Sequence, residues 1–137
     1  MMATAALLVS LASAQIPLKV ETFANRPTTF QMGAVAKRAR DEGATIVQYR
    51  LDERAHIEAR LSEDLGRDPG KARVILTKRL DENPEWIERL THSAMGQTRA
   101  MMLGISRFPA VVIADQIYYT DHLDEAIVLH RKAANAR

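Results

Sequence analysis

Cysteine is absent from the 137 residues of this chain. Thiol–disulfide exchange begins with attack by a thiolate, so a chain without cysteine cannot perform redox catalysis with its own thiols. The same absence rules out disulfide bonds, which stabilise many small exported domains. The folded chain must therefore be held together by packing and other noncovalent contacts.

Aromatic residues and an excess of one charge are also scarce. Phe, Trp and Tyr make up 5% of the chain and hydrophobic residues 47%, which predicts a mainly aliphatic core. Lys and Arg number 19 against 17 Asp and Glu, and the two signs are interleaved along the chain. Dispersed charge disfavours nucleic-acid binding, for which basic residues normally cluster. The length fits one globular domain, which we expect over residues 15–137.

Hydrophobic runs are short, and the clearest one lies near the N-terminus. Ala3 to Ala14 is an apolar segment of small residues that ends in Ala-Ser-Ala before Gln15. This pattern is typical of a secretory signal peptide, so we expect residues 1–14 to be removed on export to the periplasm. The alternative is an uncleaved N-terminal anchor. About a dozen apolar residues fall short of the roughly 20 that cross a bilayer, so spanning is disfavoured.

The N-terminal half predicts a strand, a helix and a second strand. Residues 18–23 alternate in polarity, and residues 45–51 are rich in β-branched side chains, so both segments are expected strands. Between them we expect a helix capped by Thr28 or Thr29 that runs to about Glu42. Such a βαβ unit favours a parallel strand pair with a right-handed crossover.

The segment from about 53 to 103 is predicted to be helical throughout. Asp68-Pro69 and Asn83-Pro84 each place a capping side chain before a proline suited to a first helical turn, which divides the segment into three helices. Trp86, just inside the third helix, is expected in the core rather than at an interface. The methionines of this helix either fill the core or form a pliant surface patch that accepts a partner helix; they are Met95, Met101 and Met102.

The C-terminal part predicts a hairpin and a last helix. Residues 109–114 form a short apolar strand, and residues 116–119 can return as its antiparallel partner. Asp121 is expected to cap the final helix. The inner face of that helix would consist of Leu123, Ala126, Ile127 and His130.

Sequence motifs for metal binding and common enzyme chemistry are missing. No pair of histidines has the spacing of zinc ligands, and the chain lacks a Walker A loop, a dinucleotide fingerprint and a GxSxG nucleophile turn. His122 beside Asp121 and Asp124 is a local cluster that a solvated helix start explains better than a metal. We expect no cofactor. The other histidines are His56, His92 and His130.

Two segments give the predicted element order a more specific interpretation. FANRPT at 23–28 resembles the corner of a thioredoxin fold, where a Cys-x-Pro-Cys turn joins a strand to a helix. GISRFPAVVI at 104–113 resembles the segment that faces this turn and carries a proline, usually cis. The resemblance implies an α/β, thioredoxin-like fold of order β-α-β…β-β-α, with a helical insertion between the second and third strands. It also implies a cis Phe108-Pro109 bond against the turn.

The C-terminal third carries a further resemblance. RAMMLGISRFPAVVIADQIYYTDHLDEAI at 99–127 resembles a family of thioredoxin-like proteins of integrating conjugative elements, which are related to pilin-assembly proteins of type IV secretion. VETF at 20–23 and EARLSEDL at 58–65 extend this resemblance along the chain. It implies an exported, non-catalytic accessory of conjugative DNA transfer, peripheral to the membrane at most. Its partners would be other components of the conjugation or secretion apparatus.

The turn after the first strand has three interpretations. Helix capping explains its residue types without any activity. In the second interpretation, it forms a partner-binding corner that presents backbone groups to an extended segment, as thioredoxin folds do. The third is a cysteine-free, glutathione-dependent transferase in which Thr28 activates a bound thiol, although the chain lacks room for the helical domain that such enzymes usually carry. The candidate corner residues are Asn25, Arg26, Pro27, Thr28, Phe108 and Pro109.

Overall fold

The computed structural model describes residues 17–136, so the expected signal peptide and its cleavage before Gln15 lie outside the described part. Four strands and five helices follow one another in the described residues. Their bounds are β1 (Lys19–Ala24), α2 (Ala34–Asp41), β2 (Thr45–Arg50), α3 (Glu53–Ser62), α4 (Pro69–Glu82), α5 (Glu85–Leu103), β3 (Ala110–Ile113), β4 (Gln116–Tyr118) and α6 (Leu123–Asn135).

The strands form one mixed sheet in the order β2-β1-β3-β4. β1 and β2 are parallel, as expected of a βαβ unit, whereas β3 runs antiparallel to both β1 and β4. The helices of the insertion lie between β2 and β3 in the sequence. The predicted α/β, thioredoxin-like architecture with a helical insertion is therefore confirmed.

The hairpin between β3 and β4 turns on two residues. Ala114 and Asp115 have φ angles of 50° and 63°, the left-handed pair that a tight two-residue hairpin requires. The strand partners that follow are Ile113 with Gln116 and Val111 with Tyr118. This register carries Tyr119 to the same end of the sheet as Pro109.

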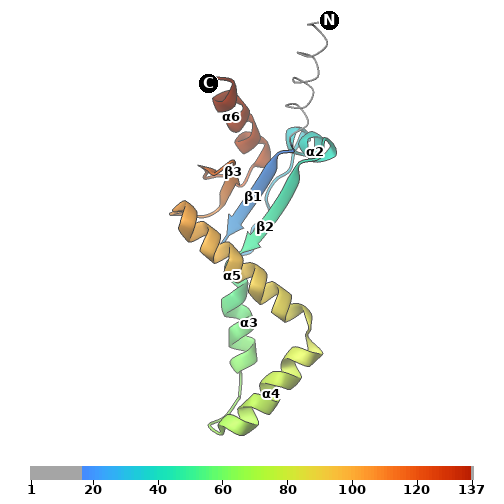
Figure 1. Cartoon of the computed structure of the whole chain (residues 1–137), viewed down its shortest axis with the longest axis vertical. Helices are drawn as coiled ribbons and strands as arrows, with labels where there is room; N and C mark the ends of the chain where they lie inside the picture. Colours follow the sequence, from blue (N-terminus) through green and yellow to red (C-terminus); the bar gives the residue numbers. More distant parts are fainter. Residues whose placement is uncertain (1–16, 137) are drawn as a thin grey trace, which may run out of the picture.

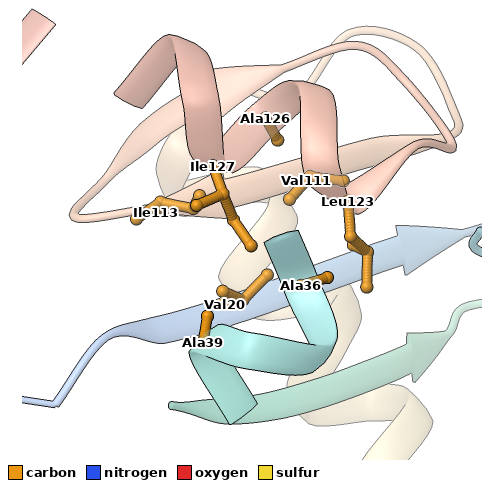
Figure 2. Packing of buried hydrophobic residues seen from close by; sticks show 8 residues of the cluster. All are labelled: Val20, Ala36, Ala39, Val111, Ile113, Leu123, Ala126 and Ile127. Carbon is orange, nitrogen blue, oxygen red and sulfur yellow. The ribbon is translucent and has the colours of Figure 1, made fainter. Parts of the chain in front are cut away.

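α2 and α6 cover one face of the sheet. The two helices bury Ala36, Ala39, Ala126 and other apolar side chains against β1 and β3, and Figure 2 shows these side chains converging from both helices. Burying a Val, Leu or Ile side chain contributes about 1.5 to 3 kcal/mol, so this small aliphatic core is a main source of stability. The prediction that Leu123, Ala126 and Ile127 point inward is confirmed, whereas His130 is only partly buried.

α5 crosses the opposite side of the sheet, and α3 and α4 extend away from it (Figure 1). Under α5 a second core joins Phe23, Tyr49 and Val112, because alternate strand residues point to opposite faces. The insertion has a third core of Ile57, Leu61 and Trp86. Trp86 is 7% exposed, which confirms its expected core position.

Three predicted helix caps are wrong. α2 begins at Ala34 rather than near Thr28 or Thr29. At α6 the N-cap residue is His122, whose backbone N–H donates to Thr120 Oγ1 at 3.0 Å, and Asp121 forms no cap bond. Asn83 does not cap α5; its side-chain amide instead donates to the Arg79 carbonyl at 2.9 Å, in the last turn of α4.

The predicted cap of α4 is confirmed. Asp68 Oδ1 accepts hydrogen bonds from the backbone N–H groups of Gly70 and Lys71, at 2.9 and 3.4 Å. Pro69 occupies the first helical turn, where its missing N–H is not needed. Within residues 17–136, no helix is both long and apolar enough to cross a membrane.

Candidate functional site

The pairing of β1 with β3 brings the two sequence-predicted loops to one end of the sheet. Phe23 lies opposite Ala110 in an antiparallel register, so the residues after Ala24 and the residues before Ala110 leave the sheet side by side. The Phe108-Pro109 bond is cis, as expected. We call residues 25–28 and 106–109, together with Tyr119, the corner.

The turn at 25–28 is an exposed loop rather than a helix start. Asn25, Arg26 and Pro27 are exposed and Thr28 is partly buried. The Thr28 hydroxyl donates to the Arg26 carbonyl at 3.1 Å, a local bond that holds the turn. Because α2 begins several residues later, the turn cannot act as its N-cap, and the capping explanation of these residues is wrong.

The second loop of the corner is fastened to Tyr119. The Ser106 backbone N–H donates to the Tyr119 hydroxyl at 3.3 Å, and the two hydroxyls lie 3.1 Å apart. Hydrogen bonding by Ser106 lowers the pKa of the Tyr119 phenol below its ordinary value, because these bonds favour the phenolate. The Arg107 guanidinium lies 4.4 Å from the Tyr119 ring centroid, a cation–π contact.

Sequence reasoning missed Tyr119 and Ser106 as members of this corner. The signal that could have found Tyr119 is the hairpin register, since a two-residue turn after Ile113 brings the residue after β4 to the end of the sheet where Pro109 lies. Phe108, by contrast, packs partly buried against the core under α5. Its ring therefore anchors the loop.

The charge of the corner is positive. Arg26 and Arg107 are exposed, and neither forms an ion pair with another residue in the range 17–136. Arg50, which lies opposite Ala24 in β2, is instead neutralised by Asp52 at 2.6 Å. That hydrogen bond lowers the pKa of the Asp52 carboxyl below its usual range.

The N-terminus of α2, which the resemblance of residues 23–28 to a thioredoxin corner makes a candidate site element, is occupied by Asp124 of α6. Its carboxylate accepts hydrogen bonds from the backbone N–H groups of Gly33, Val35 and Ala36 at 3.0, 3.2 and 2.9 Å. A Cβ atom at Gly33 would collide with the Asp124 carboxylate, so a larger residue there would have to displace this side chain. Asp124 supplies the negative charge that a helix N-terminus favours.

The histidine cluster at the start of α6 shows no metal-binding geometry. His122 Nε2 lies 3.4 Å from Asp121 Oδ1, but Asp124 faces α2 instead. Within the described part of the chain, no three His, Cys, Asp or Glu residues are placed to hold a metal ion. His92 packs elsewhere, with its ring stacked on Tyr49 and Nε2 at 2.7 Å from the Gln48 carbonyl.

A family model covers most of the chain. Residues 32–133 match the family described as "Protein of unknown function (DUF1525)". The match spans α2 to α6 and includes the 106–109 loop, Tyr119 and Asp124, whereas the 25–28 turn precedes it. No curated protein and no solved structure matches the chain with significance. The chain therefore belongs to this DUF1525 family of unknown function.

Proposed function

We propose that this protein is a non-catalytic, thioredoxin-fold accessory of conjugative DNA transfer that binds another protein of the transfer apparatus at its corner. The fold supports the proposal, because the corner keeps the loop arrangement of a thioredoxin fold in a chain with no cysteine. Its resemblance to proteins of integrating conjugative elements supplies the cellular role. The contact itself is argued from the exposed groups of the corner.

The observation that carries the proposal is the free main chain beside the sheet end. Among the backbone–backbone hydrogen bonds of the described residues, none involves Arg107 or Phe108. An extended partner segment can therefore pair with this loop, as in recognition by strand addition. The exposed guanidinium groups of Arg26 and Arg107, one on each loop of the corner, favour a partner segment that carries carboxylates.

The transferase interpretation has no comparable support. It requires a hydroxyl at the start of a helix, but the Thr28 hydroxyl donates to the Arg26 carbonyl and lies outside α2. The backbone N–H groups that begin α2 are engaged by Asp124. We therefore propose binding rather than catalysis for this protein.

The proposed location is the periplasm, with the chain peripheral to the membrane at most. This part of the proposal depends on the apolar segment from Ala3 to Ala14 and the small residues before Gln15. The proposed partners are other exported components of the conjugation or secretion apparatus. Nucleic acid is not a proposed partner, because the basic residues of the chain are interleaved with acidic ones.

Charge reversal at the corner should reduce conjugation. Reversing both charges should weaken binding of an acidic partner by about 1.4 kcal/mol, which is a factor of ten in affinity. In a donor strain that lacks the native gene, the double variant Arg26→Glu/Arg107→Glu should therefore transfer DNA about tenfold less often than the wild type. Both side chains are exposed, so the variant should fold. Mating assays measure the transfer frequency, and immunoblots of donor cells give the protein level.

The matched control is Arg67→Glu/Arg73→Glu, which makes the same change in charge on exposed residues of the insertion. This control should transfer DNA at the wild-type frequency. Equal transfer by both double variants, at equal protein level, would count against a contact at the corner. A gene deletion without any effect on transfer would count against the conjugative role.

A further inference from the structure

α2 and α6 both end at the end of the sheet opposite the corner. The two helices begin together, because Asp124 of α6 accepts hydrogen bonds from the first turn of α2. In Figure 2, Leu123 lies toward the end of β1 and Ile127 toward its beginning. Ala36 and Ala39 of α2 follow the same direction. Both helices therefore run toward the start of β1, whereas the corner lies beyond its end.

α6 projects past this end of the sheet. Ile127 shares a core with Val20 and Ile113, the pair of β1 and β3 residues nearest the start of β1. About 12 Å of helix follows before Asn135, at 1.5 Å per residue. Residues 131–136 are all exposed, and Figure 1 shows the tip of α6 beyond the strands. The last turns of α6 are therefore open to a partner.

Exposed basic residues gather at this end of the molecule. They come from the start of β1, the last turn of α2 and the projecting part of α6. None of them forms an ion pair with another residue in the range 17–136. We call these residues the basic end, and they are Lys19, Arg40, Arg131 and Lys132.

The acidic residues near the basic end do not cancel its charge. Glu42 is paired with Arg38 at 3.3 Å, and Asp115 of the β3-β4 hairpin is paired with Arg99 at 2.7 Å. Asp41 has no ion pair among the described residues and offsets one basic charge. The formal net charge of the whole chain is only +2, so the fold concentrates positive charge here.

Apolar side chains accompany the basic residues on α6. Val128 and Leu129 are 38% and 45% exposed. They precede Lys132 by four and three residues, so the three side chains share one face of the helix. A helical face that combines exposed apolar side chains with Lys or Arg is typical of segments that lie at a membrane surface. There the apolar side chains reach the acyl chains, and the basic groups stay among the headgroups.

We propose that the basic end, together with Val128 and Leu129, docks this protein on the surface of a membrane that contains anionic lipid. The negative potential of such a surface attracts each nearby Lys or Arg. The exposed apolar pair favours lipid over nucleic acid, because acyl chains accept apolar side chains and a phosphate backbone does not. A chain docked in this way keeps the corner in water, on its far side. The proposal does not depend on the function of the corner.

Vesicle sedimentation of the purified full chain tests the charge. Vesicles of equal parts phosphatidylcholine and phosphatidylglycerol should bind the chain at least about tenfold more tightly than vesicles of phosphatidylcholine alone. Arg131→Gln/Lys132→Gln should weaken binding to the anionic vesicles about twenty-five-fold, since each basic charge at such a surface contributes about a factor of five. The control Arg67→Gln/Arg73→Gln makes the same change on exposed residues of the insertion and should bind like the wild type. Equal binding to both kinds of vesicle, or equal binding by both double variants, would overturn the proposal.

A second pair of variants tests the apolar contact. Leu129→Asn should weaken binding to the anionic vesicles about fivefold, because the membrane would bury the exposed part of the leucine side chain. Met101→Asn is the control: this methionine of α5 is 81% exposed, and its replacement should leave binding unchanged. An equal loss in both variants would contradict docking through α6. Tighter binding of duplex DNA than of anionic vesicles, unaffected by Leu129→Asn, would assign the basic end to nucleic acid and overturn the proposal.

Fluorescent labels test the orientation without relying on the loss of binding. Because the chain has no cysteine, a polarity-sensitive dye on one introduced cysteine reports one position. With anionic vesicles, the emission of a dye at Ala133→Cys, in the exposed tip of α6, should shift to the blue. A dye at Val74→Cys, on an exposed residue of α4, should not shift. A shift at Val74→Cys, or none at Ala133→Cys, would place the contact elsewhere and contradict the proposal.

Discussion

Arg99→Met is expected to lower the free energy of unfolding by about 3 to 5 kcal/mol, because it leaves a buried carboxylate without its ion pair. The carboxylate belongs to Glu21 of β1, whose side chain is 5% exposed. Arg99 Nε and Nη2 donate to its two oxygens at 3.1 and 3.0 Å. Nη2 also donates to Asp115 at 2.7 Å, and these carboxylates raise the pKa of Arg99 above its usual range. Urea denaturation of the full chain measures the loss.

Two further variants identify the cause of that loss. Glu21→Met/Arg99→Met removes both charges, and should recover most of the stability, since a buried ion pair replaced by apolar residues is often close to neutral. Arg38→Met breaks an exposed ion pair with Glu42, where the two side chains are 83% and 60% exposed, and should leave stability nearly unchanged. If the double variant were as unstable as Arg99→Met, the loss would come from packing rather than from the unpaired charge.

Asp124→Ala is expected to cost about 2 to 3 kcal/mol, because backbone N–H groups at the start of α2 lose a charged acceptor. Asp124→Asn keeps one side-chain oxygen, and should lose about half as much. Thermal and urea unfolding measure both effects. Hydrogen exchange should locate the change, because the variants should speed exchange at the Ala36 amide more than at the amides of β1.

The neighbouring Asp121→Ala is the control for this prediction. It removes a carboxylate just before α6, but its only side-chain partner in the described part of the chain is His122. Its stability should stay close to that of the wild type. Equal destabilisation by Asp121→Ala and Asp124→Ala would mean that charge near α6, rather than the bonds to α2, accounts for the effect.

The sequence was informative wherever one segment determines its own structure. Alternating polarity predicted β1, and helical periodicity with Asp68-Pro69 predicted the start of α4. The segment with Phe108-Pro109 predicted at which end of the sheet β3 begins. These signals are local, because strand alternation, capping and turn chemistry depend on residues a few positions apart.

What the sequence did not reveal depends on residues far apart in the chain. Asp124 caps a helix that begins about ninety positions earlier, so no pattern near Ala34 indicates it. The approach of Arg99 to Glu21 requires α5 to lie on the sheet, which periodicity alone does not establish. The Thr28 cap was predicted because a proline and two threonines suit a helix start, but the chain continues as a loop until Gly33.

Site-specific photo-cross-linking in mating donor cells tests most directly the claim that the corner contacts the transfer apparatus. A photoreactive residue in place of Arg107 should give a covalent adduct that mass spectrometry identifies as a component of the conjugation or secretion machinery. The same residue in place of Arg73, exposed on α4, should not give that adduct. No adduct at Arg107, or the same adduct from both positions, would contradict the account.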